Sequence, residues 1–100
     1  MAKGYWIARV DVTDPERYQE YVRANAAVFH KFGARFIVRG GHFNAVEGFS
    51  RSRNIVIEFA DHATALACYQ SPEYQAATAL RDRHGVVDLI IIEGYDGPQP

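Results

Sequence analysis

The stretch from Phe36 to Phe59 constrains the fold most, because it is patterned as two strands joined by a hairpin, with a helix-forming stretch on each side. Along each strand one face is apolar and the other carries a charged residue, which follows the two-residue period of a pleated strand. Gly40 and Gly41 interrupt the first strand and suggest a bulge or a close backbone approach. The pattern resumes over His42–Glu47, and Asn54–Phe59 forms the second strand. We therefore predict two antiparallel neighbours at the centre of the chain.

The segments on either side of the hairpin add two helices and two further strands. In chain order we expect a strand over 4–12, a helix over 15–32, a helix in two pieces over 62–83 and a strand over 88–95. Asp14 can cap the first helix, and Pro15 suits its first position, where the missing N–H costs nothing. Ser71 and Pro72 form a second pair of cap and proline, so the later helix is expected to break and restart there.

The resulting order, β-α-β-β-α-β, predicts a single α+β domain over residues 1–96, followed by a loose tail over 97–100. The hairpin makes the two central strands antiparallel, and each flanking β-α-β unit should cross over with a right hand. These rules favour a ferredoxin-like antiparallel sheet in the order 4-1-3-2, with both helices on one face.

The uncovered face of this sheet predicts a homodimer. It is expected to carry Tyr5, Ile7, Ile37 and Val56, together with apolar residues of the last strand. So much exposed apolar area is unusual in a monomer. Two sheets packed face to face would bury it and would enclose a barrel-like interior, where we expect the functional pocket.

Composition narrows the classes of partner and the compartment. The net charge of −1 argues against nucleic acid, which would favour a basic face. No run approaches the roughly 18 apolar residues of a membrane span, and the N-terminus lacks the apolar core of a signal peptide. Cys68 is the single cysteine, so an intrachain disulfide is impossible. We therefore expect a cytoplasmic protein with no membrane or nucleic-acid partner.

A set of short motifs along the chain resembles a known protein family. The motifs are Gly4-Tyr5, Asp14–Tyr21, Gly33–Gly41, Val46–Gly48, Arg53–Phe59, Ser71–Gln75, Arg81 and Ile92–Tyr95. Together they cover nearly the whole chain, which resembles a bacterial family of short proteins of unknown function in the dimeric α/β-barrel superfamily. The resemblance implies a ferredoxin-like homodimer and supplies no catalytic residues. The wider superfamily includes cofactor-free quinol monooxygenases, muconolactone isomerase and stress-response barrels, and these relatives use the barrel interior as a pocket.

Charged residues on the uncovered face are the first candidates for a site. Arg9, Arg39 and Glu58 are predicted there, and Arg39 precedes the two glycines. An arginine beside bare backbone can present its guanidinium to a carboxylate, so we predict that Arg39, together with Arg9, binds an anion. The alternative is an internal ion pair between Glu58 and either arginine, because buried charges are generally paired.

Two residues are candidates for proton transfer. His42 could act as a general base near neutral pH, and the alternative is a merely exposed hairpin histidine. Glu58 is the second candidate. Glu47 could assist as an acid or base, or it could be a turn residue that pairs with Arg51 or Arg53.

The remaining ligand-binding candidates are polar or aromatic side chains on the helices and in the polar loop before the second hairpin strand. They are Tyr21, Asn25, Arg53, Tyr69 and Arg81. The tyrosines lie on helical stripes whose aromatic members are usually core, although a hydroxyl could reach the edge of a pocket. Asn25 is an isolated polar group that would bond either to a ligand or to the backbone or a neighbouring tyrosine.

We predict no metal and no cofactor, because the four histidines are scattered and the glycine pair does not open a helix as a phosphate loop does. Two functions stay open. The first is the binding of a small aromatic or acidic metabolite in the cavity of the dimer, with cofactor-independent monooxygenase- or isomerase-like chemistry as an extension. The second is a non-catalytic structural or binding homodimer with no small-molecule site.

Overall fold

The computed structural model describes residues 2–100, so Met1, the first residue of the expected domain, lies outside the described part. The elements are β1 (Gly4–Val12), α1 (Pro15–Lys31), β2 (Arg35–Arg39), β3 (Arg53–Phe59), α2 (His62–Gln70), α3 (Pro72–Arg81) and β4 (Gly85–Glu93). Their order and type confirm the predicted β-α-β-β-α-β pattern, with the second helix in two pieces.

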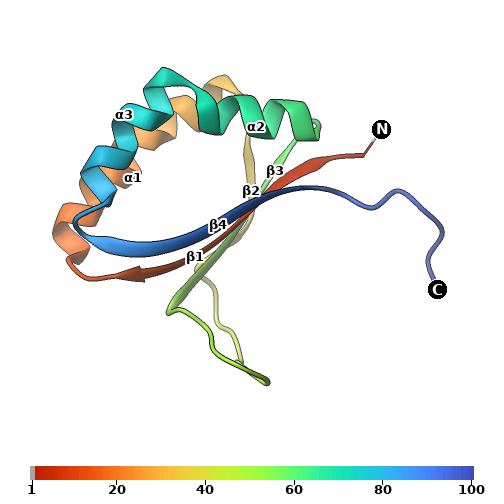
Figure 1. Cartoon of the computed structure of the whole chain (residues 1–100), viewed down its shortest axis with the longest axis horizontal. Helices are drawn as coiled ribbons and strands as arrows, with labels where there is room; N and C mark the ends of the chain where they lie inside the picture. The colour runs from red at the N-terminus through yellow and green to blue at the C-terminus, as the bar shows by residue number, and fades with distance from the viewer. Residues whose placement is uncertain (1) are drawn as a thin grey trace.

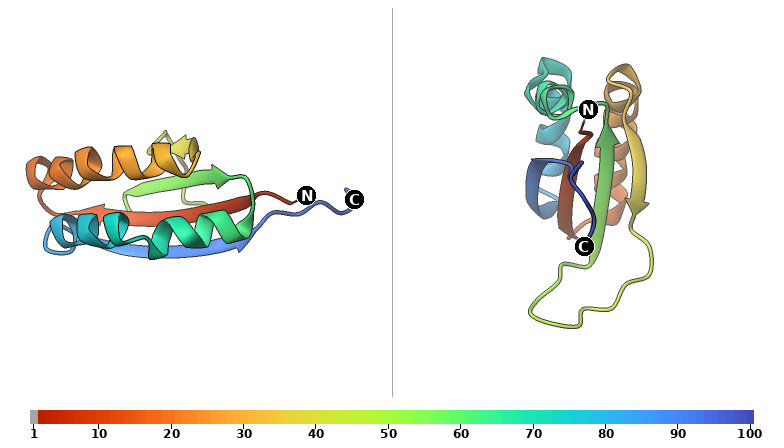
Figure 2. Two further views of the ribbon diagram at one scale, coloured as in Figure 1. Left: turned by 90° about the horizontal axis from the view of Figure 1, so that it is seen from above. Right: turned by 90° about the vertical axis from the view of Figure 1, so that its right-hand side faces the viewer.

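The four strands form one antiparallel sheet in the order β2-β3-β1-β4. The three helices lie on one side of this sheet, and its other face is uncovered (Figures 1 and 2). This is the predicted ferredoxin-like arrangement. No helix among residues 2–100 is long and apolar enough to cross a membrane.

The helix boundaries follow from local capping. The Asp14 carboxylate accepts a hydrogen bond from the backbone N–H of Arg17 at 3.2 Å, which satisfies one of the free donors at the start of α1. Ser71 caps two helices. Its hydroxyl donates to the carbonyl of Cys68 at the end of α2 and accepts from the N–H of Tyr74 in α3. Because Pro72 cannot continue α2, the chain restarts as α3 at the predicted place.

The core lies between the sheet and the helices, and Trp6 is at its centre. Its ring is 2 % exposed and lies 4.9 Å from the ring of Tyr74 and 5.2 Å from that of Phe29, in both cases edge to face. Its indole N–H donates to the carbonyl of Ala65 at 2.8 Å, so burial leaves no free donor on this side chain. These contacts join β1 to all three helical segments.

The predicted continuation of the first hairpin strand over His42–Glu47 is wrong. Strand β2 ends at Arg39, and residues 40–52 form a loop without regular structure that hangs on the side of the sheet away from the helices (Figure 1). Gly40 has a φ of +65°, a conformation that favours glycine and that turns the chain out of the strand. The last strand also differs from the prediction, since β4 begins at Gly85 and ends at Glu93.

A bulge in β2 changes which side chains face the helices. Phe36 lies opposite Ile57, but the next paired residue, Val38, lies opposite Val56, so Ile37 is an extra residue in the ladder. One extra residue exchanges the two faces of a strand beyond it. Arg39 therefore points to the helix side and Val38 to the uncovered side.

Aliphatic side chains form a row across the uncovered face. Val38 pairs with Val56, Val56 with Ile7, and Ile7 with Ile90, so the row spans all four strands. Ile90 is 54 % exposed and Val38 is 43 % exposed. The predicted apolar open face is therefore present in the single chain, but because of the bulge Val38 takes the place in this row that was predicted for Ile37.

Candidate functional site

The candidate site is a cavity on the helix side of the sheet, where the core is incompletely filled. A narrow inner cavity of about 40 Å³ adjoins a wider outer pocket of about 300 Å³. The two share four lining residues, Tyr18, Val22, Arg39 and Arg53. Six aromatic side chains line the inner cavity: Trp6, Tyr18, Tyr21, Phe29, Phe36 and Tyr74. We expected the pocket on the opposite face, inside the barrel of a dimer.

Arg39 reaches this cavity because of the bulge in β2, so its predicted position on the face away from the helices is wrong. Its guanidinium carbon lies 4.2 Å from the centre of the Phe36 ring, which is a stacking contact. Within residues 2–100 it forms no ion pair and no side-chain hydrogen bond. Its charge is therefore available to a ligand.

Arg53, the first residue of β3, lies on the same side and lines both the cavity and the pocket. Its guanidinium packs against Gly40, where a Cβ atom would lie 2.7 Å from Nη1. Its Nε is buried and makes no hydrogen bond in the described chain. The predicted close approach at the glycine pair is therefore confirmed, and the group that uses it is Arg53.

Helix α1 adds two buried polar side chains that lack partners. Asn25 is 7 % exposed and Tyr18 is 5 % exposed, and neither side chain makes a hydrogen bond to any described residue. Burial, with a smaller effect of Tyr21, raises the pKa of Tyr18 to about 12, although Arg53 and Arg81 act in the opposite direction. Tyr18 is therefore neutral at pH 7, and its hydroxyl can donate a hydrogen bond into the cavity.

A short hydrogen-bond network lines the inner end of the cavity. The hydroxyl oxygens of Tyr21 and Tyr74 lie 2.5 Å apart, and Arg81 Nη1 donates to the Tyr74 hydroxyl at 3.1 Å. Burial and the proximity of Tyr21 raise the pKa of Tyr74, so Tyr74 is protonated. Arg81 also forms an ion pair of 3.0 Å with Asp82, and its Nε is buried without a partner.

The site as a whole is rich in donors and poor in acceptors. Three guanidinium groups line the inner cavity, and in the described chain neither the cavity nor the pocket is lined by an aspartate or glutamate. Of the three, only Arg81 has a carboxylate partner, the exposed Asp82. Such a site favours an anionic ligand with an aromatic or apolar body.

The remaining predicted residues lie elsewhere. On the uncovered face, Arg9 Nη2 donates to the carbonyl of Phe49 at 2.6 Å, and Glu58 accepts from the hydroxyl of Tyr5 at 3.3 Å. Within residues 2–100, Glu58 forms no ion pair with Arg9 or Arg39, and a pair between these residues inside a dimer stays a prediction. Tyr69 packs its ring 5.9 Å from Trp6 and does not line the cavity.

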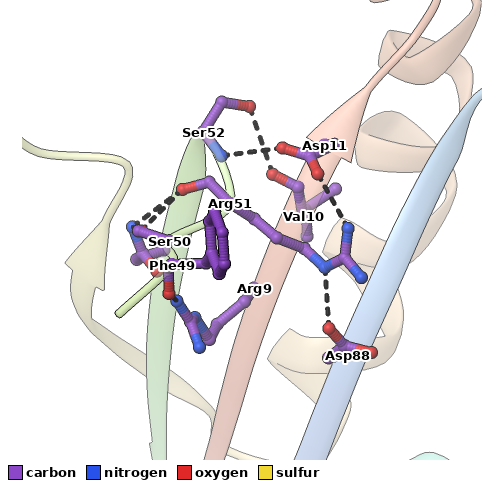
Figure 3. Close-up of polar contacts among 9 residues, drawn as sticks. Arg9, Val10, Asp11, Phe49, Ser50, Arg51, Ser52 and Asp88 are labelled. Atoms are coloured by element: carbon purple, nitrogen blue, oxygen red, sulfur yellow. Dashed lines mark hydrogen bonds and ion pairs between the residues drawn. The ribbon is translucent and has the colours of Figure 1, made fainter. Parts of the chain in front are cut away.

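The loop over residues 40–52 carries His42 and Glu47, and both are exposed. Glu47 forms no ion pair within residues 2–100, so its predicted pairing with Arg51 or Arg53 is wrong. Arg51 instead crosses the uncovered face, with Nη1 2.7 Å from Asp11 Oδ2 and Nε 2.7 Å from Asp88 Oδ2 (Figure 3). These contacts fasten the end of the loop to β1 and β4.

Sequence reasoning thus found five of the polar residues at the cavity, and the structure brings these five together: Tyr21, Asn25, Arg39, Arg53 and Arg81. It did not assign Tyr18 and Tyr74 to the site. Their signal was present, because tyrosines on the buried stripe of a helix need a hydrogen-bond partner or a cavity for their hydroxyls. Residues 2–100 contain no group of three or more His, Cys, Asp or Glu side chains that could hold a metal ion.

Comparison with known families decides which family the chain represents. The model of a domain of unknown function, DUF1330, matches residues 3–95. The chain belongs to the DUF1330 family. This confirms the resemblance to a family of unknown function. A search of curated proteins gives no match for this DUF1330 chain.

Solved structures similar to this DUF1330 protein share its fold at low identity. A protein of unknown function from Rhodopseudomonas palustris has a TM-score of 0.75 and 17 % identity, with 96 % of this chain and 85 % of that chain covered. SnoaB from Streptomyces nogalater, a cofactor-independent oxygenase, has a TM-score of 0.64 and 12 % identity, with coverage of 100 % and 97 %. A dimeric ferredoxin-like protein of unknown function from Thermobifida fusca has a TM-score of 0.57 and 14 % identity, with coverage of 91 % and 92 %. At these identities the likeness concerns the fold alone.

Proposed function

We propose that this DUF1330 protein binds a small organic anion, such as an aromatic carboxylate, between its helices and its sheet. One observation carries the proposal: the Arg53 guanidinium and the Asn25 amide line the same cavity, and neither has a hydrogen-bond partner in the described chain. Buried polar groups in folded proteins are nearly always paired, so their convergence on a cavity marks a place where another molecule supplies the partner.

A carboxylate fits the chemistry of these groups. The guanidinium is a planar fork of donors that matches the two oxygens of a carboxylate, and the bond is charge-assisted on both sides. The outer pocket of about 300 Å³ is at the lower end of the range for small-molecule sites, which suits a ligand with one ring. Tyr18 and Val22, shared by pocket and cavity, would contact the ring of such a ligand.

Binding is better supported than catalysis. SnoaB, a neighbour in fold, is a cofactor-independent oxygenase, and the predicted monooxygenase- or isomerase-like chemistry would follow that analogy. The two predicted proton carriers, however, do not line the cavity: His42 is in the exposed loop and Glu58 is on the other face of the sheet. Their catalytic role stays a prediction, and so does a cytoplasmic location, for which the single buried thiol of Cys68 is the support.

We also propose that the protein is a homodimer that packs through its uncovered sheet face. The aliphatic row across β2, β3, β1 and β4 supports this, because exposed apolar rows of this length are uncommon in monomers. The alternative function, a structural dimer with no small-molecule site, uses the same interface and differs only at the cavity. Ligand binding therefore separates the two functions.

Isothermal titration calorimetry with benzoate, salicylate and cinnamate tests the binding proposal. We expect Arg53→Met to weaken the binding of an aromatic carboxylate about tenfold or more, because it removes a charge-assisted hydrogen bond. Thermal stability should stay the same or rise, since Arg53 has no ion pair to lose within residues 2–100.

Arg23→Met is the matched control, because Arg23 is exposed on α1 and does not line the cavity. It should bind as the parent protein does. If none of the carboxylates binds the parent protein, or if both variants bind as it does, the anion site is refuted and the structural dimer is favoured.

A further inference from the structure

The hydroxyls of Tyr21 and Tyr74 carry one more phenolic hydrogen than the contacts of this pair use. The two phenolic hydroxyls carry two hydrogens, and the contact of 2.5 Å between them uses only one, whichever tyrosine is the donor. Arg81 brings its own hydrogen to the Tyr74 oxygen and consumes neither of the two. No other acceptor contacts either hydroxyl within residues 2–100. One phenolic hydrogen therefore remains unused at the cavity wall.

The size of the inner cavity limits what can accept this hydrogen. A volume of about 40 Å³ holds a substituent or a water molecule or two, whereas an aromatic ring needs the outer pocket. Tyr74 and Arg81 line the inner cavity only, while Arg39 and Arg53 line both spaces. A ring in the outer pocket would thus direct a small substituent towards the tyrosine pair.

We infer that the Tyr21–Tyr74 pair, held in place by Arg81, is the specificity element for an oxygen substituent on the ligand. The ligand class is an aromatic ring with a phenolic or enolic oxygen, which would accept the unused hydrogen in the inner cavity. This inference rests on the proposed anion site and states which ligand group occupies the inner cavity.

The charges around the pair favour the ionised form of that oxygen. Arg81 donates to Tyr74, so its positive charge strengthens the hydrogen bond that the pair can offer onward. The titratable and charged groups that line the same cavity are Tyr18, Arg39 and Arg53, and within the described chain no carboxylate is among them. The site is therefore expected to stabilise a phenolate relative to the neutral phenol.

A chromophoric phenol tests this directly. The bound pKa of 4-nitrophenol can be measured by absorbance, because its phenolate is coloured and its neutral form is not. We expect the bound probe to ionise about one pH unit below the free probe in the parent protein. Tyr74→Phe and Tyr21→Phe should each reduce this shift, because either change removes the pair that donates to the probe. A loss of packing alone would weaken binding without moving the pKa of the bound probe.

Tyr95→Phe is the matched control. It also removes one phenolic hydroxyl, but Tyr95 is exposed after the end of β4, where it donates to the carbonyl of Pro98. The probe bound to this variant should keep the full shift. An unshifted probe in the parent protein would overturn the inference, as would an equal shift in all three variants.

A second comparison separates this inference from the anion site itself. The parent protein should bind 4-hydroxybenzoate about tenfold more tightly than benzoate, and Tyr74→Phe should remove this preference. If both acids bind equally well to the parent protein, the anion site is supported, and the inference that the tyrosine pair recognises an oxygen substituent in the inner cavity is refuted. If neither acid binds and 4-nitrophenol does not bind either, both proposals fail together.

Discussion

The position of the Arg53 guanidinium depends on the missing side chain of Gly40. The glycine has a φ of +65°, and a Cβ there would lie 2.7 Å from Arg53 Nη1. The same residue ends β2, because its left-handed conformation turns the chain out of the ladder after Arg39. Gly40 therefore contributes both to the end of the strand and to the placement of a cation at the cavity.

Gly40→Ala should reduce the free energy of unfolding by about 1–2 kcal/mol, because alanine is strained at positive φ and displaces a neighbouring side chain. Urea denaturation measures this loss. Gly41→Ala is the control, since a Cβ at Gly41 meets no atom within 4 Å and its φ lies outside the left-handed region. Equal stability of the two variants would contradict the role given to Gly40.

At the scale of elements, the loop over residues 40–52 is fastened to the sheet by a polar cluster. The Asp11 carboxylate accepts from the N–H of Ser52 at 2.8 Å and from Arg51 at 2.7 Å (Figure 3). The hydrogen bond from Ser52, followed by that from Arg51, holds the pKa of Asp11 below its usual value of 3.8. Phe49, next to this cluster, is 99 % exposed, so its ring adds no packing to the polar contacts that hold the end of the loop.

The fastening of this loop should depend on pH. A carboxyl whose pKa is lowered by folding stabilises the folded form above its unfolded pKa, and this contribution is lost as the pH falls through the lowered value. The loop should therefore become easier to cleave by proteases that are active below about pH 4, and Asp11→Asn should make it easier to cleave at neutral pH as well.

Glu47→Gln is the matched control, because Glu47 is exposed in the same loop and has no ion pair in the described chain. It should leave the rate of cleavage at neutral pH unchanged. A cleavage rate of Asp11→Asn that equals the parent rate would show that the loop is held by other contacts.

At the scale of the whole molecule, the two faces of the sheet differ in what they contact. The helix side carries the core and the cavity, and the other side carries the aliphatic row formed by Val38, Val56, Ile7 and Ile90. Polar contacts border this row on both sides: Tyr5 with Glu58 at one end, and Arg51 with Asp11 and Asp88 at the other. An apolar centre with a polar rim is the usual composition of a protein interface.

Ile90→Lys should shift the protein from dimer to monomer, because it places a charge in the aliphatic row of the proposed interface. Sedimentation velocity over a range of concentrations measures the change. Leu80→Lys is the control, since Leu80 is also an exposed aliphatic residue, 38 % exposed on α3, which covers the other face of the sheet. A parent protein that sediments as a monomer at all concentrations would refute the homodimer.

The sequence by itself determined the type and order of the elements and five of the polar residues at the cavity. Strand alternation, the caps at Asp14 and Ser71 and the glycine pair are local signals, so each depends on residues a few positions apart. The antiparallel order followed from chain connectivity, since only a few arrangements of two β-α-β units obey the handedness rule.

Only the tertiary structure decided on which face of the sheet each charged residue lies and with which residue it interacts. The extra residue in β2 moved Arg39 to the helix side, and the periodicity of a strand cannot place such a register shift. Arg51 forms ion pairs with Asp11 and Asp88, which lie about forty positions away along the chain, and no local sequence pattern predicts these pairs. A cavity arises where packed side chains leave space, so its position depends on the volumes of residues from every element and becomes defined only when the chain is folded.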